Sequence, residues 1–522
     1  AQKGDTLPVS AFLGYEDGTV ELGLTAFEKR CIATSVPEWD ETKCIQCNRC
    51  SYVCPHAVIR PYLLNDAEAK TAPEGMKIVP AVGIKNYVYS LQVSKEDCTG
   101  CSSCVNCCPA KEKAIRMVPF EESSSTRELW DYGLSISDKE GAFDPYTVKG
   151  SQFRQPLLEF SAACAGCGET PYAKLMTQLF GDRVYWANAT GCSQAWGGAM
   201  PGIPYTKNKK GHGPAWSNSL FENNAEFSLG MFLSVKQQRE AQKMRAETLI
   251  KNSENTAVKE AAQEWLSVYD DFDKSAHASE KFIEAIESDM TSLGGAAKRA
   301  AEEIMQNKDQ LTKKTFWMYG GDGWAYDIGF GGLDHVLASK ENVNVFIVDT
   351  EVYSNTGGQS SKATPLGAVA QFCISGKKSA KKDLGAMLMT YGHIYVAQVA
   401  MGADMNQLIK AIKEAESYDG PSVIIAYTPC IAHGIKCGMG GAQQEMKRAV
   451  ESGYWNLYRY NPNNEKPLTI DSKEPTMEYE TFLDGEVRYS SLKRTFPENA
   501  EKYFKEGSSA AKEKYLKYKH ME

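Results

Sequence analysis

The sequence lacks several features that would place it in a common class of protein. It has no apolar run of the roughly 18 residues that a membrane-crossing helix needs. We expect no secretory leader from its first residues, and its formal net charge of −8 argues against general nucleic-acid binding. We therefore expect neither a membrane nor a nucleic acid as partner.

The chain also lacks an initiator methionine and begins at Ala1. We expect a processed chain, a subunit or the C-terminal part of a longer polypeptide. Its 522 residues exceed what one hydrophobic core supports, so several domains are expected. A content of 42% hydrophobic and 24% charged residues is typical of a water-soluble globular protein.

A disulfide framework is not expected either, because the 16 cysteines are too sparse and too patterned for one. Eight of them form two copies of one run, in which successive gaps of two, two and three residues are followed by proline. The runs are Cys44, Cys47, Cys50 and Cys54, and Cys98, Cys101, Cys104 and Cys108. This spacing is typical of two [4Fe–4S] clusters, in which the fourth cysteine of each run binds the other cluster.

Two ligand sets follow from this rule. They are Cys44, Cys47, Cys50 with Cys108, and Cys98, Cys101, Cys104 with Cys54. Zinc also accepts four cysteines, but zinc ribbons do not show this spacing with a following proline, so we favour iron–sulfur clusters. Thiolates of this kind belong in a reducing compartment, and we expect a cytoplasmic protein that moves electrons one at a time.

A second set of cysteines lies in the larger C-terminal region. Cys164 and Cys167 form a C-x-x-C pair in a glycine-rich turn, and Cys192 follows. A third cluster needs a fourth ligand. The remaining candidates are Cys31, Cys373, Cys430 and Cys437. Cys430 comes just after a predicted strand, and open α/β sheets bind ligands at the carboxyl ends of their strands. This favours Cys430, with Cys437 as the alternative.

The apolar segments of the C-terminal region predict its fold class. Strands are predicted at 315–319, 343–348, 394–399 and 423–427, with a helix at 404–417. This alternation predicts an α/β fold with a mostly parallel sheet and helices on both faces. Long polar helices are expected over 231–310, as a packing arm or a dimer contact. The cysteine runs predict a small ferredoxin-like α+β domain.

A glycine-rich turn follows the first of these strands. Gly321, Asp322 and Gly323 stand there, and the next strand ends just before Thr350 and Val352. The two strand ends offer a carboxylate, a hydroxyl and a backbone carbonyl, which are the hard oxygen ligands of Mg²⁺ beside a diphosphate. The glycines let backbone N–H groups approach phosphates at a helix N-terminus. The sequence therefore predicts a Mg²⁺–diphosphate site.

These patterns divide the chain into five predicted segments. They are a lead-in strap at 1–40, a two-cluster domain at 41–118, a linker at 119–155, a diphosphate-binding domain with the third cluster at 156–455, and a helical tail at 456–522.

Long stretches around these motifs resemble the C-terminal half of the pyruvate:ferredoxin (flavodoxin) oxidoreductases. They include 51–56, 213–222, 321–329 and 349–359, and the similarity covers nearly the whole chain. The resemblance implies a domain that binds thiamine diphosphate (ThDP), a proximal [4Fe–4S] cluster and a two-cluster domain. It also implies that domains or subunits absent from this chain supply the pyrimidine half of the ThDP site and select pyruvate.

The resemblance carries roles over to single residues. Asp322, Thr350 and the Val352 carbonyl would bind Mg²⁺, although many ThDP enzymes have asparagine where Thr350 stands. Asn355 would lie at the reactive thiazolium and the substrate, as the catalytic residue. Cofactor contacts are also implied for Gly321, Gly323, Cys192 and Ser193. The implied ligands of the proximal cluster are Cys164, Cys167, Cys192 and Cys430.

The activity implied by the resemblance is CoA-dependent oxidative decarboxylation of pyruvate to acetyl-CoA and CO₂. Electrons would pass through three [4Fe–4S] clusters to ferredoxin or flavodoxin, in a homodimer of the full enzyme. One alternative is an oxidoreductase for another 2-oxoacid, such as 2-oxoglutarate or a branched-chain acid. Another is an electron-transfer subunit without ThDP, against which the Asp322 motif speaks. Lysines at 377, 378, 381 and 382 form either a docking surface for an acidic ferredoxin or an ordinary solvated face.

Overall fold

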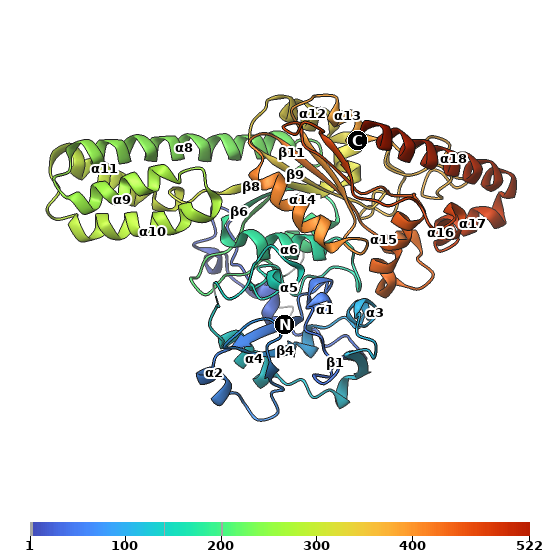
Figure 1. Ribbon diagram of the computed structural model, residues 1–522, viewed down its shortest axis with the longest axis horizontal. Helices are drawn as coiled ribbons and strands as arrows, with labels where there is room; N and C mark the ends of the chain where they lie inside the picture. The colour runs from blue at the N-terminus through green and yellow to red at the C-terminus, as the bar shows by residue number, and fades with distance from the viewer. Residues whose placement is uncertain (1–3, 140, 200–201) are drawn as a thin grey trace.

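A central sheet joins a cysteine-rich N-terminal region, a helical arm and a C-terminal tail in the computed structural model of the chain (Figure 1). The structure describes all residues except 1–3, 140 and 200–201. The sheet has eight strands in the order β13-β12-β10-β11-β9-β8-β6-β7. In the view of Figure 1 the cysteine-rich region lies below the sheet, and the arm and the tail extend to either side.

The sheet is parallel from β10 to β7. Its parallel strands are β6 (Val184–Ala189), β7 (Ala215–Ser219), β8 (Thr315–Gly321), β9 (Asn344–Asp349), β10 (Tyr395–Val399) and β11 (Ser422–Tyr427). β9, β10 and β11 are buried along their whole length, as expected for strands that are covered on both faces. The predicted α/β class with a mostly parallel sheet is confirmed.

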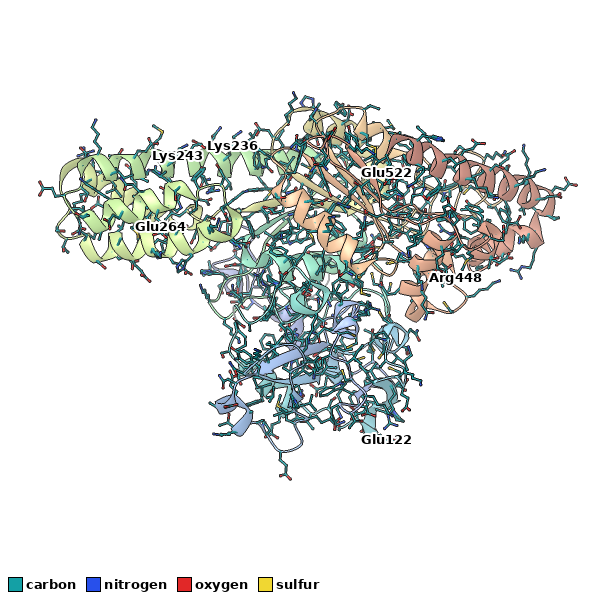
Figure 2. All side chains as sticks on the ribbon, in the orientation of Figure 1. Glu122, Lys236, Lys243, Glu264, Arg448 and Glu522 are labelled. Carbon is teal, nitrogen blue, oxygen red and sulfur yellow. The ribbon has the colours of Figure 1, made fainter. Side chains whose placement is uncertain are left out.

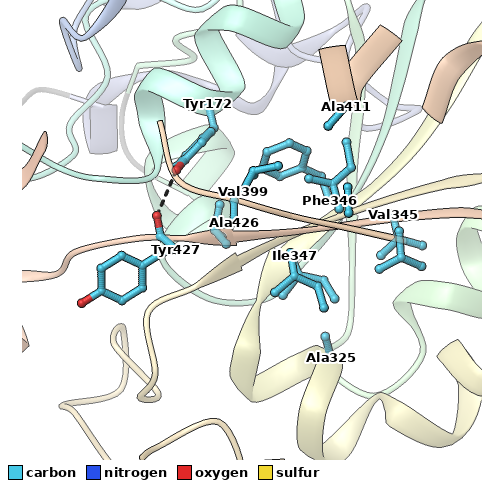
Figure 3. Packing of buried hydrophobic residues seen from close by; sticks show 14 of the residues in the cluster. Tyr172, Ala325, Val345, Phe346, Ile347, Val399, Ala411, Ala426 and Tyr427 are labelled. Atoms are coloured by element: carbon cyan, nitrogen blue, oxygen red, sulfur yellow. Dashed lines mark hydrogen bonds between the residues drawn. The ribbon is translucent and has the colours of Figure 1, made fainter. Parts of the chain in front are cut away.

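Helices cover the sheet from both sides. They include α6 (Thr170–Phe180), α13 (Leu384–Met389), α14 (Met405–Ser417), the π-helical turn η9 (Gly323–Ile328) and α12 (Phe330–Ala338). Figure 3 shows Phe346 of β9 lying toward Tyr172 of α6, whereas Ile347 lies toward Ala325 of η9. Because successive side chains of a strand point to opposite faces, β9 supplies the core on both sides. The Tyr172 hydroxyl also donates to the Tyr427 carbonyl at 2.9 Å.

Two short strands extend the sheet beyond β10. β12 (Tyr458–Tyr460) pairs antiparallel with β10, and β13 (Leu468–Ile470) pairs antiparallel with β12. The tail from residue 456 thus contains strands as well as helices. Its helices are α16 (Tyr479–Leu483), α17 (Val487–Thr495) and α18 (Pro497–Met521). Strands of three residues carry too little periodicity to be predicted from sequence.

The cysteine-rich region has its own apolar cluster, which includes Val36, Trp39 and Leu91. Its strands are β1 (Ser35–Trp39), β2 (Ile59–Leu64), β3 (Val79–Pro80), β4 (Val88–Val93) and β5 (Ile115–Pro119). β2, β4 and β3 form one antiparallel sheet, and β1 pairs with β5. The helices of this region are α1 (Arg49–Tyr52), α2 (Asp66–Lys70) and α3 (Ser103–Cys107). The segment that follows contains α4 (Arg127–Ser135) and α5 (Val148–Ser151).

The helical arm projects away from the sheet (Figure 1). It consists of α8 (Asn224–Asn252), α9 (Thr256–Ser267), α10 (Phe272–Asp289) and α11 (Gly295–Gln306), which confirms the helices predicted over 231–310. Its helices enclose a separate apolar cluster around Trp265 and Phe282. Charged side chains such as Lys243 and Glu264 cover its outside (Figure 2). Among the described residues, no helix has both the length and the apolar character needed to cross a membrane.

Candidate functional site

A cavity of about 220 Å³ opens at the carboxyl ends of the central strands. β6, β8 and β9 all end at its wall, which is where an open parallel sheet binds ligands. The wall includes most of the residues that the sequence predicted for the cofactor site. These are Cys192, Ser193, Gly321, Gly323, Thr350, Val352 and Asn355.

Asp322 lies behind this wall and is fully buried. Its Oδ1 accepts hydrogen bonds from the Thr350 backbone N–H at 3.2 Å and from the Thr350 hydroxyl at 3.0 Å. Its Oδ2 accepts from the Ser361 hydroxyl at 2.5 Å. The Thr350 Oγ1 also lies 3.0 Å from the Val352 carbonyl oxygen. The structure therefore brings together the carboxylate, hydroxyl and carbonyl that were predicted as Mg²⁺ ligands.

The acidic groups buried around Asp322 exceed the positive side chains beside them, which favours a bound cation. The carboxylates of Asp349, Glu351 and Glu486 outnumber the Lys381 and Arg488 side chains that pair with them, and the buried Asp322 carboxyl group pairs with neither cation. Burial, and next to it the nearby Asp349 carboxylate, raises the pKa of Asp322 to about 8. A bound divalent cation would stabilise the charged form of this carboxylate, so the residues fit Mg²⁺.

Lys381 takes part in this charge balance rather than in a surface. Its Nζ lies 2.7 Å from the Asp349 carboxylate and 3.1 Å from the Glu351 carboxylate. Both carboxylates are fully buried. The expectation that Lys381 belongs to a docking or solvated face is therefore wrong, since the lysine turns inward to these acids.

The glycines at the end of β8 differ in their surroundings. A Cβ at Gly323 would come within 2.5 Å of the Tyr353 ring, and one at Gly320 within 2.7 Å of Trp324. A Cβ at Gly321 would meet only the Val348 carbonyl oxygen, at 3.9 Å, because its open side faces the cavity. A diphosphate can therefore approach the backbone at Gly321. The helix that follows opens with the π-helical turn η9, not with an α-helical turn.

Asn355 is exposed on the loop that borders the cavity. Tyr353 closes this loop, because its backbone N–H donates to the Gln359 carbonyl at 2.9 Å. The structure thus places the Asn355 side chain at the cavity edge, on the same wall as Thr350. Its catalytic role stays a prediction.

Glu169 also lines the cavity, and sequence reasoning missed it. It is buried and accepts a hydrogen bond from the Trp196 indole N–H at 2.9 Å. Burial raises the pKa of its carboxyl to about 7. Its position two residues after Cys167 was the signal that could have found it.

The first predicted cluster set is gathered in the cysteine-rich region. Burial raises the pKa of the Cys47 and Cys50 thiols, and the neighbouring Cys44 and Cys108 act in the same direction. Mutual effects of this kind require sulfurs that lie close together. Cys108 thus lies with the first run rather than with its own.

The second set is gathered in the same way. Burial raises the pKa of the Cys98, Cys101 and Cys104 thiols, and Cys54 adds to the effect on each of them. The exchange of the fourth cysteine between the runs is the arrangement that a two-cluster domain uses. The role of all eight as cluster ligands stays a prediction.

The third set surrounds the edge of the cavity. Burial, followed by Glu169, raises the pKa of Cys192, and Cys430, Cys167 and Cys164 contribute in turn. Cys430 follows β11 and stands at the start of a short 3₁₀ turn, where its sulfur accepts from the Ala432 N–H at 3.5 Å. These four cysteines are therefore brought together beside the wall to which Cys192 belongs.

The alternative fourth ligand, Cys437, differs from Cys430 in exposure. Its thiol is exposed and lies against Gly441, where an added Cβ would stand 2.2 Å from the sulfur. Cys31 is exposed as well, and the Cys373 sulfur lies 3.6 Å from the Ala368 carbonyl oxygen. Within the described ranges, no group of three or more His, Cys, Asp or Glu side chains is arranged to hold a single metal ion.

The third set and the Cys98 set are neighbours. The His56 ring lies between them, with Nε2 at 3.1 Å from the Ala163 carbonyl oxygen and Nδ1 at 3.4 Å from the Thr99 hydroxyl. Ala163 precedes Cys164, and Thr99 follows Cys98.

A second contact between these sets runs through residues 439 and 440. A Cβ at Gly166 would meet Met439 at 2.7 Å, and one at Gly440 would meet the Cys101 carbonyl oxygen at 2.3 Å. The Asn106 side chain of α3 also donates to the Gly440 carbonyl at 2.9 Å. The turn between Cys164 and Cys167 is therefore held close to the Cys101 loop.

Parts of the chain match known families. Residues 43–112 match a family described as a 4Fe-4S dicluster domain. Residues 293–426 match the C-terminal TPP binding domain of thiamine pyrophosphate enzymes. Residues 1–33 match EKR, a domain of unknown function. The chain thus carries a dicluster domain and a domain for thiamine pyrophosphate, which is another name for ThDP.

Curated relatives match over the whole chain. The pyruvate-flavodoxin oxidoreductase of Klebsiella pneumoniae is 51% identical and is covered over 44% of its length. The pyruvate:ferredoxin oxidoreductase of Moorella thermoacetica is 52% identical and is covered over 45%. Each alignment spans 100% of this chain. A pyruvate dehydrogenase [NADP(+)] of Cryptosporidium parvum is 46% identical over 96% of this chain and 28% of its own.

One solved structure that matches the chain is a 2-oxoglutarate:ferredoxin oxidoreductase from Magnetococcus marinus, with a TM-score of 0.31 and 14% sequence identity. The match covers 52% of this chain and 65% of that one. The resemblance predicted from the motifs is confirmed by the sequence relatives. The chain is therefore a relative of the pyruvate-flavodoxin and pyruvate:ferredoxin oxidoreductases, and it corresponds to slightly less than half of their length.

Proposed function

We propose that this chain forms the diphosphate half of a ThDP site and the electron path of a pyruvate oxidoreductase. Coenzyme A would accept the acyl group, and ferredoxin or flavodoxin the electrons, in the cytoplasm. Since the chain spans 44–45% of these relatives, further domains or subunits would complete the pyrimidine half of the site, in a homodimer of the full enzyme. When bound, ThDP supplies the electron sink that decarboxylation of a 2-oxoacid requires.

One observation carries this proposal. The Cys192 of the third cysteine set and the Thr350 and Val352 of the cation site share the wall of one cavity. An enzyme that removes electrons from a substrate bound on ThDP needs an electron acceptor near the cofactor. The shared wall supports such an arrangement, because it brings Cys192 and the predicted cation site to one cavity.

The residues of the chain have separable tasks in this proposal. Asp322, Thr350 and the Val352 carbonyl would hold Mg²⁺, and Gly321 leaves room for the diphosphate. Asn355 would orient the substrate at the edge of the cavity. The apolar side chains that line the cavity exclude water from it, among them Phe221 and Trp324.

The three cysteine sets would form a route for electrons that begins at the cavity. From Cys192 it leads across the contact between Ala163 and His56 to the set that contains Cys98. From there it continues to the set that contains Cys44, because Cys50 of that set lies near enough to Cys104 to influence its pKa. We propose a [4Fe–4S] cluster in each set, with the Cys44 set handing electrons to the external carrier.

The alternatives are less well supported. An electron-transfer subunit without ThDP would have no use for a fully buried carboxylate such as Asp322 behind the wall of a cavity. A different 2-oxoacid would be selected by residues outside this chain. The relatives that are 51–52% identical are named for pyruvate, which favours pyruvate here.

Asp322→Asn tests the cation site. We expect it to abolish Mg²⁺-dependent ThDP binding in the assembled enzyme, because the amide has no charge to offer the metal. Iron should stay at about twelve atoms per chain, four for each of three clusters. The matched control is Asp334→Asn, whose carboxylate accepts from the Tyr391 hydroxyl at 2.7 Å and is not part of the cavity wall. Unchanged ThDP affinity in Asp322→Asn would show that the site is assigned wrongly.

A further inference from the structure

We propose that Arg488, in the C-terminal tail, is a positioning residue for the cation site. It holds Glu351 in a left-handed backbone conformation and thereby sets the Thr350 hydroxyl and the Val352 carbonyl toward one point. This inference rests on the proposed function, because it concerns the Mg²⁺ site of that proposal.

Glu351 stands between the two residues that would bind the cation. Its φ is +61°, a region that residues with a side chain rarely adopt. Its side chain is fully buried. A non-glycine residue keeps such a conformation only where the surrounding structure imposes it.

The carboxylate of Glu351 is held from different parts of the chain. Its Oε2 lies 2.7 Å from the Arg488 guanidinium and accepts from the Tyr454 hydroxyl at 2.6 Å. Its Oε1 lies 3.1 Å from Lys381. Arg488 comes from α17, Tyr454 from the segment before β12, and Lys381 from the loop before α13. The side chain is thus clamped by groups that are distant in sequence.

Arg488 is itself fixed in place. It is 4% exposed, and its Nε lies 2.6 Å from the Glu486 carboxylate. Its backbone carbonyl accepts from the Val369 N–H at 2.9 Å. A guanidinium that binds two carboxylates in a fixed plane positions them more firmly than a lysine ammonium does.

Contacts to the peptide groups on both sides of Glu351 extend this restraint to the residues of the cation site. The Thr350 carbonyl oxygen lies 2.7 Å from Nε2 of the His433 ring. The Glu351 carbonyl oxygen accepts a hydrogen bond from the Thr364 hydroxyl at 2.5 Å. With both carbonyls held, the Thr350 Oγ1 and the Val352 carbonyl stay 3.0 Å apart. If Glu351 relaxed to a negative φ, the adjoining peptides would rotate and separate these two oxygens.

Substitution of Arg488 tests the inference with Mn²⁺ as a spectroscopic substitute for Mg²⁺ in the assembled enzyme. We expect Arg488→Gln to weaken Mn²⁺ binding at saturating ThDP at least tenfold, with iron content unchanged. Arg488→Lys should recover part of the loss, because it keeps the charge without the planar fork. The matched control is Arg494→Gln, an exposed arginine on the same helix, which should behave as the wild type.

A second variant separates positioning from general destabilisation. Glycine adopts a positive φ without a clamp, so Glu351→Gly in the Arg488→Gln background should restore most of the Mn²⁺ affinity. A double variant as weak as Arg488→Gln would overturn the proposal, and so would full Mn²⁺ affinity in Arg488→Gln. If Asp322→Asn also leaves Mn²⁺ binding unchanged, the cation site of the proposed function fails. If Asp322→Asn abolishes binding and Arg488→Gln does not, only the positioning role fails.

Discussion

The helical arm and the C-terminal tail are both polar helical additions to the sheet, but they are attached differently. Apart from the first turns of α8 and Phe272 at the start of α10, the arm packs on its own cluster around Trp265 and Phe282. Tail residues such as Tyr489 and Phe504 belong to the same apolar cluster as the sheet. Arg488 of the tail also reaches Glu351 beside the cavity. The arm thus has an apolar cluster of its own, whereas the tail shares the cluster of the sheet and supports the candidate site.

The difference lies in buried contacts and not in charge or helix content. Both elements carry many charged residues on their surfaces (Figure 2). Of the two, the described part of the tail inserts charged side chains, Arg488 and its partner Glu486, into the interior next to the cavity. We infer that a polar helical segment can be essential to a site through one buried residue, and the predictions below test this contrast.

The largest effect is expected at the turn that the tail supports. The Val487 N–H donates to the Gly434 carbonyl at 2.9 Å, just beyond the 3₁₀ turn that begins at Cys430. We expect Cys430→Ser to lose about four of about twelve iron atoms and to abolish reduction of the carrier, because a cluster loses a thiolate ligand. Iron analysis and electron paramagnetic resonance measure this.

The control for that experiment is Cys437→Ser, on the exposed side of the same segment. It should keep all iron and full activity. Loss of a cluster in Cys437→Ser, with Cys430→Ser intact, would reverse the assignment of the fourth ligand.

Much of the fold could be predicted from the sequence, because its signals are local. The strands that became β8, β9, β10 and β11 are apolar runs bounded by turn residues, and the two cysteine runs are patterns of fixed spacing. The ligand exchange of Cys54 and Cys108 follows from a rule about such runs. Local patterns of this kind survive without any knowledge of the tertiary structure.

The supports of the site could not be predicted in this way. The ion pair between Arg488 and Glu351 joins residues 137 positions apart, and no spacing in the sequence indicates it. In the sequence, Lys381 lies among other lysines and resembles a surface residue. In the fold, it pairs with two carboxylates at the end of a central strand. Burial depends on the packed tertiary structure, so a sequence pattern does not show which charged residues will be buried.

The next largest effect compares the two cores directly. Trp265→Ala in the arm and Phe504→Ala in the tail should each cost about 3–5 kcal/mol of local stability, because each removes a buried aromatic side chain. Hydrogen exchange should rise in α9 to α11 for the first variant. For the second it should rise in the loop around Gly367, which Phe504 contacts. Only Phe504→Ala should weaken ThDP binding.

A loss of ThDP binding in Trp265→Ala would break the comparison, because it would couple the arm to the cavity. Equal exchange in both variants over the whole chain would also contradict it, since the arm would then unfold together with the sheet.

The smallest effect is expected for ion pairs on the two surfaces. Arg245 pairs with Glu303 on the arm at 2.7 Å, and Lys493 pairs with Asp484 on the tail at 2.7 Å, all with side chains in contact with solvent. Glu303→Gln and Asp484→Asn should each change the free energy of unfolding by about 0–1 kcal/mol, and less at high salt. Denaturant unfolding at two salt concentrations measures both. A much larger effect on the tail would mean that its surface charges, and not the buried Arg488, distinguish it from the arm.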